Sequence, residues 1–422
     1  MKEDKIEMSR AVLVEVDFKN DKREDWKRNL AELSRLMETA GGETVAVLTQ
    51  AKAAPDVRTL IGSGKVGELA YLCKHNNADL VVFDEDLSPS QIRNLEDSID
   101  GARVIDRSML ILDIFALHAT TSEGRLQVEL AQLKYTAPRL IGRGNELSRL
   151  GGGIGTRGPG ESKLESDRRH LKRKITALEE ELKEIDKSRM TMRAARDKSK
   201  LMKIAIVGYT NAGKSTLLNS LTDAGILAED KLFATLDPTT RKYELPCGES
   251  VLLTDTVGFI RNLPHHLVKA FKSTLDEAVY ADALLIIIDS SDPDCESQLH
   301  VTEDTLAELG AKDKPTLYVF NKCDIETNQT LTMRKVGDFE DIVYISAKTG
   351  QGIDLLISKL EKIVNDGKKT ITFLIPLAKQ ALVSKLYSDA AVIECVYLDD
   401  VVRVIATVDA KTESLLKEFI VE

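Results

Sequence analysis

The chain carries, near its middle, the run Lys203-Ile-Ala-Ile-Val-Gly-Tyr-Thr-Asn-Ala-Gly-Lys-Ser215. The apolar stretch 204–207 predicts a buried parallel strand, and Leu217 and Leu218 predict an apolar helix after the loop. Between them stands the pattern G-x-x-x-x-G-K-S, whose backbone N–H groups and helix N-terminus suit phosphate oxygens. The run predicts a P-loop, in which Lys214 neutralises phosphate charge. Taken alone, it is also consistent with a simple glycine-rich turn.

Three more motifs follow in order and favour the P-loop. Residues 251–258 read Val-Leu-Leu-Thr-Asp-Thr-Val-Gly, an apolar strand that ends in D-T-x-G. Asn-Lys-Cys-Asp at 321–324 follows the apolar run 317–320, and Ser-Ala-Lys at 346–348 follows the run 342–345. Four motifs in this order, each at the carboxyl end of a predicted strand, predict a GTPase domain with GTP as substrate.

Each motif has a chemical reason. Ser215 and Asp255 supply oxygen ligands for Mg²⁺, and the Gly258 N–H faces the γ-phosphate. Asp324 accepts both N1–H and N2–H of guanine, a pair that adenine does not offer. Ser346, Ala347 and Lys348 supply the backbone contact to the guanine carbonyl. The predicted catalytic residues are Lys214, Thr235 and Gly258, and the predicted metal ligands are Ser215, Thr235 and Asp255. The residues expected to contact the nucleotide are Gly208, Tyr209, Thr210, Asn211, Ala212, Gly213, Lys214, Ser215, Phe233, Ala234, Thr235, Leu236, Asp237, Asp255, Thr256, Val257, Gly258, Asn321, Lys322, Cys323, Asp324, Ser346, Ala347 and Lys348.

Length and composition limit the classes of protein to which the chain can belong. At 422 residues, with 43% apolar and 30% charged residues, the chain predicts about three globular domains. The longest apolar run, 283–288, is far shorter than the roughly 20 residues of a membrane span. The N-terminus does not have the apolar core of a signal peptide, and the five cysteines are scattered singly. We expect a cytoplasmic monomer without a disulfide framework or a zinc site.

Charge is distributed unevenly. The net charge is −10, yet residues 121–200 alone carry +7. This asymmetry indicates one anion-facing segment on an acidic body, although a solvated charged helix is the simpler alternative. Within that segment, residues 139–160 combine glycines at 151–153, 155, 158 and 160 with Arg139, Arg143, Arg149 and Arg157.

The rest of the chain shows regular elements. Residues 11–105 alternate strands (12–16, 45–48, 80–83, 103–105) with amphipathic stretches, which predicts a parallel doubly wound sheet. Residues 88–91 predict a capping box. Apolar residues keep helical spacing over 107–137, and a heptad seam runs from Leu164 to Ile185. These stretches predict an antiparallel helical hairpin with the glycine- and arginine-rich loop 139–160 at its tip.

We therefore predict an α/β protein of four parts. They are an N-terminal parallel α/β domain (1–106), the helical hairpin (107–200), a Ras-like P-loop GTPase domain (201–366) and a small α+β C-terminal domain (367–422). In the last part we expect strands at 371–375, 392–398 and 401–408, and helices near 379–389 and 412–421.

Nearly the whole chain resembles the HflX family of ribosome-associated, translation-related P-loop GTPases, a group close to Obg. The stretches that carry the resemblance lie outside the GTPase motifs: 61–69, 83–96, 104–107 (Val-Ile-Asp-Arg), 126–133 and, above all, Gly-Gly-Gly-Ile-Gly-Thr-Arg-Gly-Pro-Gly-Glu at 151–161. One departure is His118, where the family more often has arginine.

The resemblance implies a factor that binds the large (50S) ribosomal subunit and splits or rescues stalled ribosomes under stress. A basic, glycine-rich tip without aromatic residues suits RNA recognition by shape and charge; the alternative for 151–160 is an inert linker. Two other functions remain open: an RNA-binding or RNA-remodelling protein regulated by GTP, and a large-subunit assembly GTPase.

The resemblance also ranks three threonines between the P-loop and Asp255. We favour Thr235 as the Mg²⁺-ligating switch threonine, because related translation GTPases carry a threonine at that offset before Leu-x-Pro. Thr239 and Thr240 are consistent with turn chemistry after Pro238.

Two further positions bear on turnover. Phe259 stands where Ras-like enzymes place the glutamine that orients water, so intrinsic hydrolysis should be slow and should need a partner. Asn211 stands where potassium-dependent GTPases coordinate K⁺, although a loop-capping asparagine explains it equally well.

A second glycine-rich run lies at 62–67. In an α/β domain, Gly-Ser-Gly-Lys-Val-Gly could bind a second nucleotide or RNA phosphate. The resemblance implies an ATP-responsive RNA-unwinding activity for some family members. A plain helix N-terminal turn is the favoured interpretation, because a lone G-x-G-K is weak.

Overall fold

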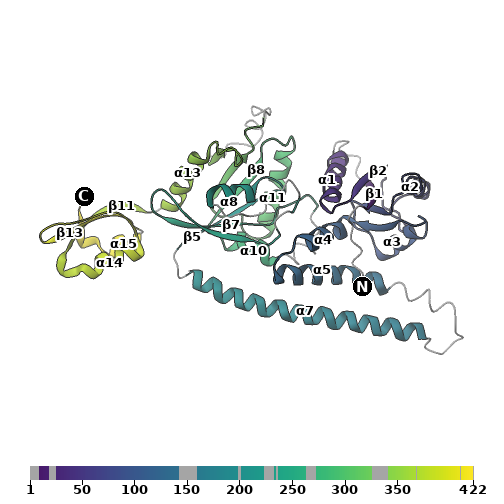
Figure 1. Cartoon of the computed structure of the whole chain (residues 1–422), viewed down its shortest axis with the longest axis horizontal. Helices are drawn as coiled ribbons and strands as arrows, with labels where there is room; N and C mark the ends of the chain where they lie inside the picture. The colour runs from purple at the N-terminus through teal and green to yellow at the C-terminus, as the bar shows by residue number, and fades with distance from the viewer. Residues whose placement is uncertain are drawn as a thin grey trace. The chain divides into compact units, whose positions relative to one another are not determined.

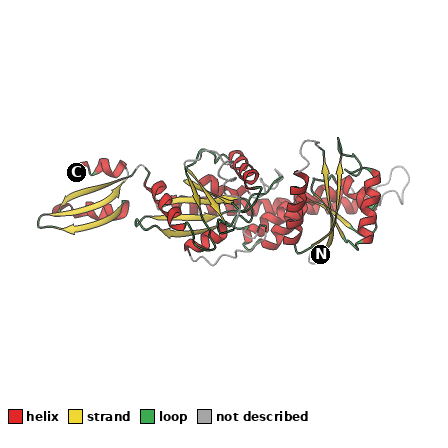
Figure 2. Cartoon of the chain, turned by 90° about the horizontal axis from the view of Figure 1, so that it is seen from above, coloured by secondary structure: helices red, strands yellow, loops and turns green. Residues whose placement is uncertain are grey.

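The computed structural model describes residues 9–18, 25–141, 159–197, 201–222, 232–233, 236–262, 272–325, 341–366, 368–408 and 410–421 (Figures 1 and 2). The chain divides into two compact units. The first unit is Met1–Ala194 with Glu229–Asp237 and Val257–Leu275, and the second is Ala195–Ala228 with Pro238–Thr256 and Asp276–Glu422. Two segments from the predicted GTPase region therefore cluster with N-terminal residues. We call Glu229–Asp237 the first inserted segment and Val257–Leu275 the second.

The first unit contains a parallel sheet. In its described part the strands lie in the order β2-β1-β3-β4, and all three neighbouring pairs are parallel, as predicted. Helices pack on both faces of the sheet (Figure 2); β3 and residues 11–16 of β1 are buried, whereas β2 carries polar residues and buries only Leu48. The elements are β1 (Arg10–Asp17), α1 (Asp25–Thr39), β2 (Glu43–Ala51), α2 (Ser63–His75), β3 (Leu80–Phe83), α3 (Pro89–Glu96) and β4 (Arg103–Asp106).

Local sequence explains how two of these helices begin. The Ser88 hydroxyl accepts a hydrogen bond from the Gln91 N–H (3.3 Å), and the Gln91 side chain accepts one from the Ser88 N–H (2.9 Å). The predicted capping box is confirmed. The run 62–67 forms the start of α2, with Gly62 as its N-cap residue and its N–H bonded to Gln50 (2.9 Å). This agrees with a plain helix N-terminal turn.

Three helices follow the sheet: α4 (Arg107–His118), α5 (Ser122–Ile141) and α7 (Pro159–Asp197). The predicted hairpin is present, since α5 and α7 run in opposite directions (Figure 1) and are joined by the ion pairs Lys134–Glu179 (2.7 Å) and Lys174–Glu129 (2.5 Å). Among the described residues of the predicted seam, Leu171, Ile175, Leu178, Leu182 and Ile185 are less exposed than most of their neighbours.

Two details of the hairpin differ from prediction. The stretch 107–137 is not one helix, because residues 119–121 form a turn between α4 and α5. The predicted tip loop 139–160 is shorter at both ends, since 139–141 belong to α5 and 159–160 to α7. The rest of that loop, with Arg143, Arg149 and Arg157, lies outside the described residues.

A buried arginine lies where α4 begins. Arg107 is 2% exposed and forms ion pairs with Asp84 (2.5 Å) and Glu32. It also donates a hydrogen bond to the carbonyl oxygen of Arg261 (3.0 Å), in the second inserted segment. A buried guanidinium is costly unless its charge and donors are satisfied, so these contacts fix α1, β3 and the inserted segment together.

The carboxylates of Glu15, Asp84 and Glu85 lie close together at the same edge of the sheet. Glu15 is 4% exposed; burial, and then the charge of Asp84, raise its pKa. Burial, and then the charges of Glu15 and Asp84, raise the pKa of Glu85 to about 8. Glu85 also accepts a hydrogen bond from the Val16 N–H (2.9 Å). The protonated form of Glu85 is therefore favoured in the folded protein.

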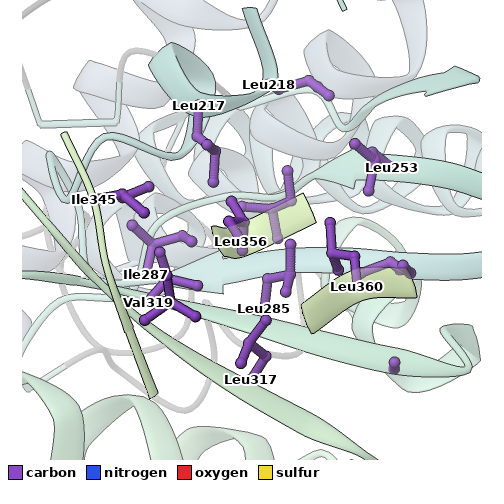
Figure 3. Packing of buried hydrophobic residues seen from close by; sticks show 14 of the residues in the cluster. Leu217, Leu218, Leu253, Leu285, Ile287, Leu317, Val319, Ile345, Leu356 and Leu360 are labelled. Atoms are coloured by element: carbon purple, nitrogen blue, oxygen red, sulfur yellow. The ribbon is translucent and has the colours of Figure 1, made fainter. Parts of the chain in front are cut away.

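The second unit contains a six-stranded sheet of order β10-β9-β8-β5-β7-β6 in its described part. All neighbours are parallel except β6 and β7. Leucines of α8 and α13 pack against the central strands and form the core (Figure 3). The elements are β5 (Met202–Gly208), α8 (Lys214–Thr222), β6 (Thr239–Glu244), β7 (Ser250–Asp255), α10 (Lys272–Tyr280), β8 (Ala283–Asp289), α11 (Cys295–Glu308), β9 (Thr316–Asn321), β10 (Ile342–Tyr344) and α13 (Ile353–Asn365).

The C-terminal part is an antiparallel sheet of order β12-β13-β11-β14. The predicted helix at 412–421 is wrong beyond Leu415, because Ile420 and Val421 form a strand that pairs with β11. The elements are β11 (Lys369–Pro376), η1 (Leu377–Lys379), α14 (Gln380–Asp389), β12 (Ala391–Tyr397), β13 (Val401–Val408), α15 (Ala410–Leu415), η2 (Lys417–Phe419) and β14 (Ile420–Val421). Across the described residues, every helix is too short or too polar to cross a membrane.

The raised pKa of Glu85 predicts a pH-dependent stability of the first unit. Protonated Glu85 contributes its full stabilisation below pH 4.5, the ordinary pKa of this carboxyl, and the stabilisation is lost as the pH rises through the raised pKa of about 8. Glu85→Gln keeps an acceptor for the Val16 N–H without the charge. We expect it to flatten the fall of unfolding free energy between pH 5 and 8 by up to about 1.4 kcal/mol per pH unit.

The measurement is urea unfolding followed by the fluorescence of Trp26, the single tryptophan, which lies on α1. Glu38→Gln, at an exposed position of the same helix, is the matched control. Equal pH slopes for Glu85→Gln and the wild-type chain would contradict the assignment.

Candidate nucleotide-binding site

The predicted P-loop connects β5 to α8. Gly208 and Gly213 both have positive φ angles (148° and 95°). A Cβ atom at Gly208 would lie 2.2 Å from the Ile287 carbonyl oxygen, and one at Gly213 would lie 2.2 Å from the Asn321 side-chain nitrogen. Only glycine fits at either position, so the loop closes tightly against β8 and against Asn321.

Lys214 begins α8 and is buried. Its Nζ donates hydrogen bonds to the carbonyl oxygens of Gly208 (3.2 Å) and Tyr209 (2.8 Å). Burial lowers the pKa of Lys214 to about 8, and the charge of Asp255 partly opposes this shift. Nearby phosphate charge would favour the ammonium form further, so the lysine suits an anionic ligand.

Ser215 and Asp255 lie in contact at the ends of α8 and β7. The Ser215 hydroxyl donates a hydrogen bond to Asp255 Oδ2 (2.6 Å). A hydroxyl and a carboxylate are the hard oxygen ligands that Mg²⁺ prefers, and two protein ligands leave positions for phosphate oxygens and water. The donor set therefore fits Mg²⁺.

A buried hydroxyl lies in the same loop. Within the described residues, Thr210 Oγ1 has no hydrogen-bond partner. A buried donor without a partner is costly, and a phosphate oxygen would satisfy it. The hydroxyl of Thr256, by contrast, donates to the Ile206 carbonyl (2.8 Å) and so supports the strand.

Asn321 joins the P-loop to the last motif. Its side chain donates to the Ala212 carbonyl (2.8 Å) and accepts from the Ala347 N–H (2.9 Å). At 2% exposure the amide is fully enclosed. Asn321 thus holds two loops that are 135 residues apart in the chain in one arrangement.

The base-reading residues lie beside this amide. Asp324 is exposed, and a hydrogen bond from the Ser346 hydroxyl lowers its pKa, so the carboxylate is ionised and can accept two N–H groups of a base. Lys322 adopts a positive φ (65°) and pairs with Asp289 (2.6 Å). The Cys323 N–H donates to the Ile345 carbonyl (3.1 Å).

Among the remaining predicted residues, Asn211 and the exposed Lys348 belong to the second unit, whereas those at 233–237 and 257–258 fall in the first. Ala234 and Thr235 lie outside the described residues. Phe233 and Leu236 are buried, and Asp237 bonds to Thr120 and Thr121. In the second inserted segment, Val257 and Gly258 are buried, and so is Phe259, which presents no polar group to water.

Some features were not predicted. The sequence placed Asn321 among nucleotide contacts but gave no sign of its two loop contacts. The stretch 104–107 carries part of the family resemblance, but its sequence assigns no role to Arg107. Nothing in the local pattern linked Thr120 and Thr121 to Asp237.

The comparisons agree with this geometry. Family models match "GTP-binding GTPase N-terminal" at residues 27–116, "GTP-binding GTPase Middle Region" at 118–196 and "50S ribosome-binding GTPase" at 203–322. GTPase HflX of Caldanaerobacter subterraneus subsp. tengcongensis is 48% identical over 412 residues, which cover 98% of this chain and 94% of that protein. This chain belongs to the HflX family of GTPases.

HflX of Escherichia coli is 43% identical over 383 residues, with 90% of this chain and 89% of that protein covered. Among solved structures, a GTP-binding protein of Sulfolobus solfataricus in complex with GDP is 28% identical with a TM-score of 0.45, covering 85% of this chain and 99% of that one. That score is too low to carry a structural argument. As an HflX protein, this chain is a GTPase with a 50S ribosome-binding GTPase domain.

Loss of the Lys214 ammonium should abolish nucleotide binding, because the enclosed loop would face phosphate charge with no cation. We expect Lys214→Ala to lose GDP binding and GTP turnover in equilibrium titration and phosphate-release assays. Lys312→Ala, at an exposed position of the same unit, should behave as wild type. A Lys214→Ala variant that hydrolyses GTP at the wild-type rate would contradict the assignment of residues 208–215 as a P-loop.

Asp324 should set the choice of base. Asp324→Asn replaces one acceptor oxygen with a donor, so preference should move from guanine toward xanthine nucleotides. Competitive titration with GDP and xanthosine diphosphate measures the shift. Asp313→Asn, an exposed change in the same unit, is the control. Unchanged guanine preference in Asp324→Asn would mean that another group reads the base.

Proposed function

We propose that this HflX protein is a GTP-driven factor that binds the large ribosomal subunit and splits or rescues stalled ribosomes under stress. The observation that carries the proposal is the combination of the P-loop, Asp255 and the loop 321–324 with a helical hairpin whose described part carries a run of exposed basic residues. On α7, Arg168, Arg169, Lys172 and Arg173 are exposed. A cytoplasmic, monomeric protein is part of this proposal.

The nucleotide part of the proposal assigns a role to each loop. The P-loop amides and Lys214 would bind the phosphates, while Ser215, Asp255 and Thr235 would hold Mg²⁺, which would supply positive charge beside the phosphates. The Gly258 N–H faces the γ-phosphate, and Asp324 reads guanine. In the described structure, Asn321 ties the P-loop to the Ser346 loop, so phosphate and base would be held by one preformed frame.

The proposed dependence on the ribosome rests on the residue at the position where Ras-like enzymes orient the attacking water. Phe259 is buried and carries no group that could orient water. Slow intrinsic turnover is therefore expected, with rRNA or a ribosomal protein stabilising the transition state. K⁺ is a second candidate helper through Asn211. That residue has a positive φ (62°), which asparagine tolerates well, so loop conformation alone also explains it.

We assign the contact with RNA to the positively charged side chains of the hairpin. Arginines and lysines that follow phosphates release counterions, which makes binding depend steeply on salt. The exposed basic residues of α7 lie in the described part of the hairpin, and Arg143, Arg149 and Arg157 precede them in the sequence. We propose that this surface contacts rRNA of the large subunit by shape and charge.

Changing Arg143, Arg149 and Arg157 together to Gln should weaken binding to purified large subunits. The slope of log K against log salt should fall by about two to three, since each lost phosphate contact removes about 0.7 to 0.9. Co-sedimentation with a non-hydrolysable GTP analogue at several salt concentrations measures both quantities.

The matched control changes Arg58, Lys74 and Lys312 to Gln, which removes equal charge at exposed positions outside the hairpin. An unchanged slope in the hairpin variant would exclude these arginines from the contact. Preferential binding to immature particles would favour an assembly role over splitting.

A further inference from the structure

The proposed base-reading residues lie at the end of a strand that has a parallel neighbour on each side. Residues 321–324, which we call the base loop, begin at the last residue of β9, and β9 lies between β8 and β10. The carboxyl ends of β8 and β10 therefore flank the base loop at one edge of the sheet. The sequence motifs assign a role to the loop after β10, at 346–348, but none to residues 289–291 at the end of β8. We call residues 289–291 the supporting loop.

Ser290 fixes the backbone where the base loop begins. Its N–H donates a hydrogen bond to the Asn321 carbonyl oxygen (2.9 Å), which continues the pairing of β8 with β9. Its hydroxyl donates a second hydrogen bond to the same oxygen (2.7 Å), and Ser290 is only 4% exposed. A shift of the base loop would leave this buried hydroxyl without its acceptor, which is costly. The carbonyl of Asn321 is therefore held in one position.

Asp289 fixes the next side chain of the base loop. Its Oδ2 pairs with Lys322 Nζ (2.6 Å), while its Oδ1 accepts hydrogen bonds from the Ser291 N–H (3.0 Å) and the Ser291 hydroxyl (2.5 Å). The side chains of Asp289 and Lys322 are 15% and 26% exposed, so solvent screens the ion pair only in part. Because both carboxylate oxygens are engaged, Asp289 is a rigid partner for the lysine.

The backbone of Lys322 explains why the base loop needs such support. Its φ angle is 65°, a left-handed conformation that costs free energy in any residue with a Cβ atom. A residue keeps this conformation only where its surroundings determine it. Asp289 holds the Lys322 side chain from β8, and on the side of β10 the Cys323 N–H donates to the Ile345 carbonyl (3.1 Å). The turn that leads to Asp324 is therefore held from both neighbouring strands.

We propose that Asp289 and Ser290 are positioning residues for guanine recognition, which hold the base loop so that the Asp324 carboxylate is aimed at the base. Ser290 acts through Asn321, and Asp289 acts through Lys322. The inference rests on the proposed role of Asp324 in reading guanine. Two parallel hydrogen bonds from a base need a fixed carboxylate plane, so a small rotation of the loop weakens them. A loop that is already in the bound conformation also lowers the entropic cost of binding.

The test compares GDP with inosine diphosphate, whose base keeps N1–H but lacks the N2 amino group. The ratio of the two dissociation constants measures how well the carboxylate accepts the second N–H group. Asp289→Asn should lower the wild-type preference for GDP about fivefold and speed GDP release about tenfold, because a charged contact of the base loop is lost. Ser290→Ala keeps the backbone hydrogen bond and should shift both quantities less, in the same direction. Displacement of a fluorescent GDP analogue from the full chain measures them.

Two further variants separate positioning from loss of structure. Asp341→Asn is the matched control, because it breaks another aspartate–lysine pair of the second unit, with Lys359 (3.1 Å), at the amino end of β10. It should leave the ratio at the wild-type value. Lys322→Gln should lower the ratio, and adding Asp289→Asn to it should lower the ratio no further, because the two side chains act as one pair. General destabilisation would weaken GDP and inosine diphosphate alike and would not move the ratio.

Asp324→Asn shows which part of the account fails if the ratio does not change as expected. If Asp324→Asn leaves the ratio unchanged, another group reads the base, and the proposed role of Asp324 and the inference fall together. If Asp324→Asn lowers the ratio while Asp289→Asn and Ser290→Ala leave it at the wild-type value, only the inference is overturned. Equal weakening of GDP and inosine diphosphate in the supporting-loop variants, or additive losses of Asp289→Asn and Lys322→Gln, would also overturn it.

Discussion

The buried guanidinium of Arg107 is the constraint on which the arrangement of the first unit depends. A buried cation must be neutralised, and its planar donors must be used. Asp84 supplies a carboxylate from the end of β3, Glu32 supplies one from α1, and the Arg261 carbonyl comes from the second inserted segment. One side chain therefore ties the sheet edge to a segment that follows the D-T-V-G motif in the chain.

Helix α4 gains a particular role from this constraint. Its first residue holds the second inserted segment, and the turn after its last residue holds the first inserted segment through Asp237. Both inserted segments are thus attached to one helix, one at each end.

The nucleotide loops of the second unit are fixed by different means. Gly208 and Gly213 allow backbone approaches that a Cβ would forbid, and Asn321 joins two loops by hydrogen bonds from a fully enclosed amide. Membership of the HflX family accords with this frame. The loops that Asn321 joins belong to the second unit, whereas the contacts of Asp237 with Thr120 and Thr121 belong to the first.

Several elements of the fold and the P-loop could be predicted because these features depend on local sequence. The β-branched runs of β1 and β3, the capping box at Ser88 and the P-loop each carry their signal within a few residues. The helix expected at 412–421 failed because pairing of Ile420 with β11 overrides local helix propensity. The contacts of Arg107 with Glu32 and Arg261, and those of Asp237 with Thr120 and Thr121, join residues more than 70 positions apart, and no periodicity in one sequence records such pairs.

The most direct measurement is GTP hydrolysis in potassium buffer with and without purified large ribosomal subunits, with ATP as a parallel substrate. The account predicts stimulation of about tenfold or more, confined to GTP, because Asp324 is proposed to read guanine and Phe259 stands where water would be oriented. Absence of stimulation, or equal stimulation of ATP hydrolysis, would contradict it.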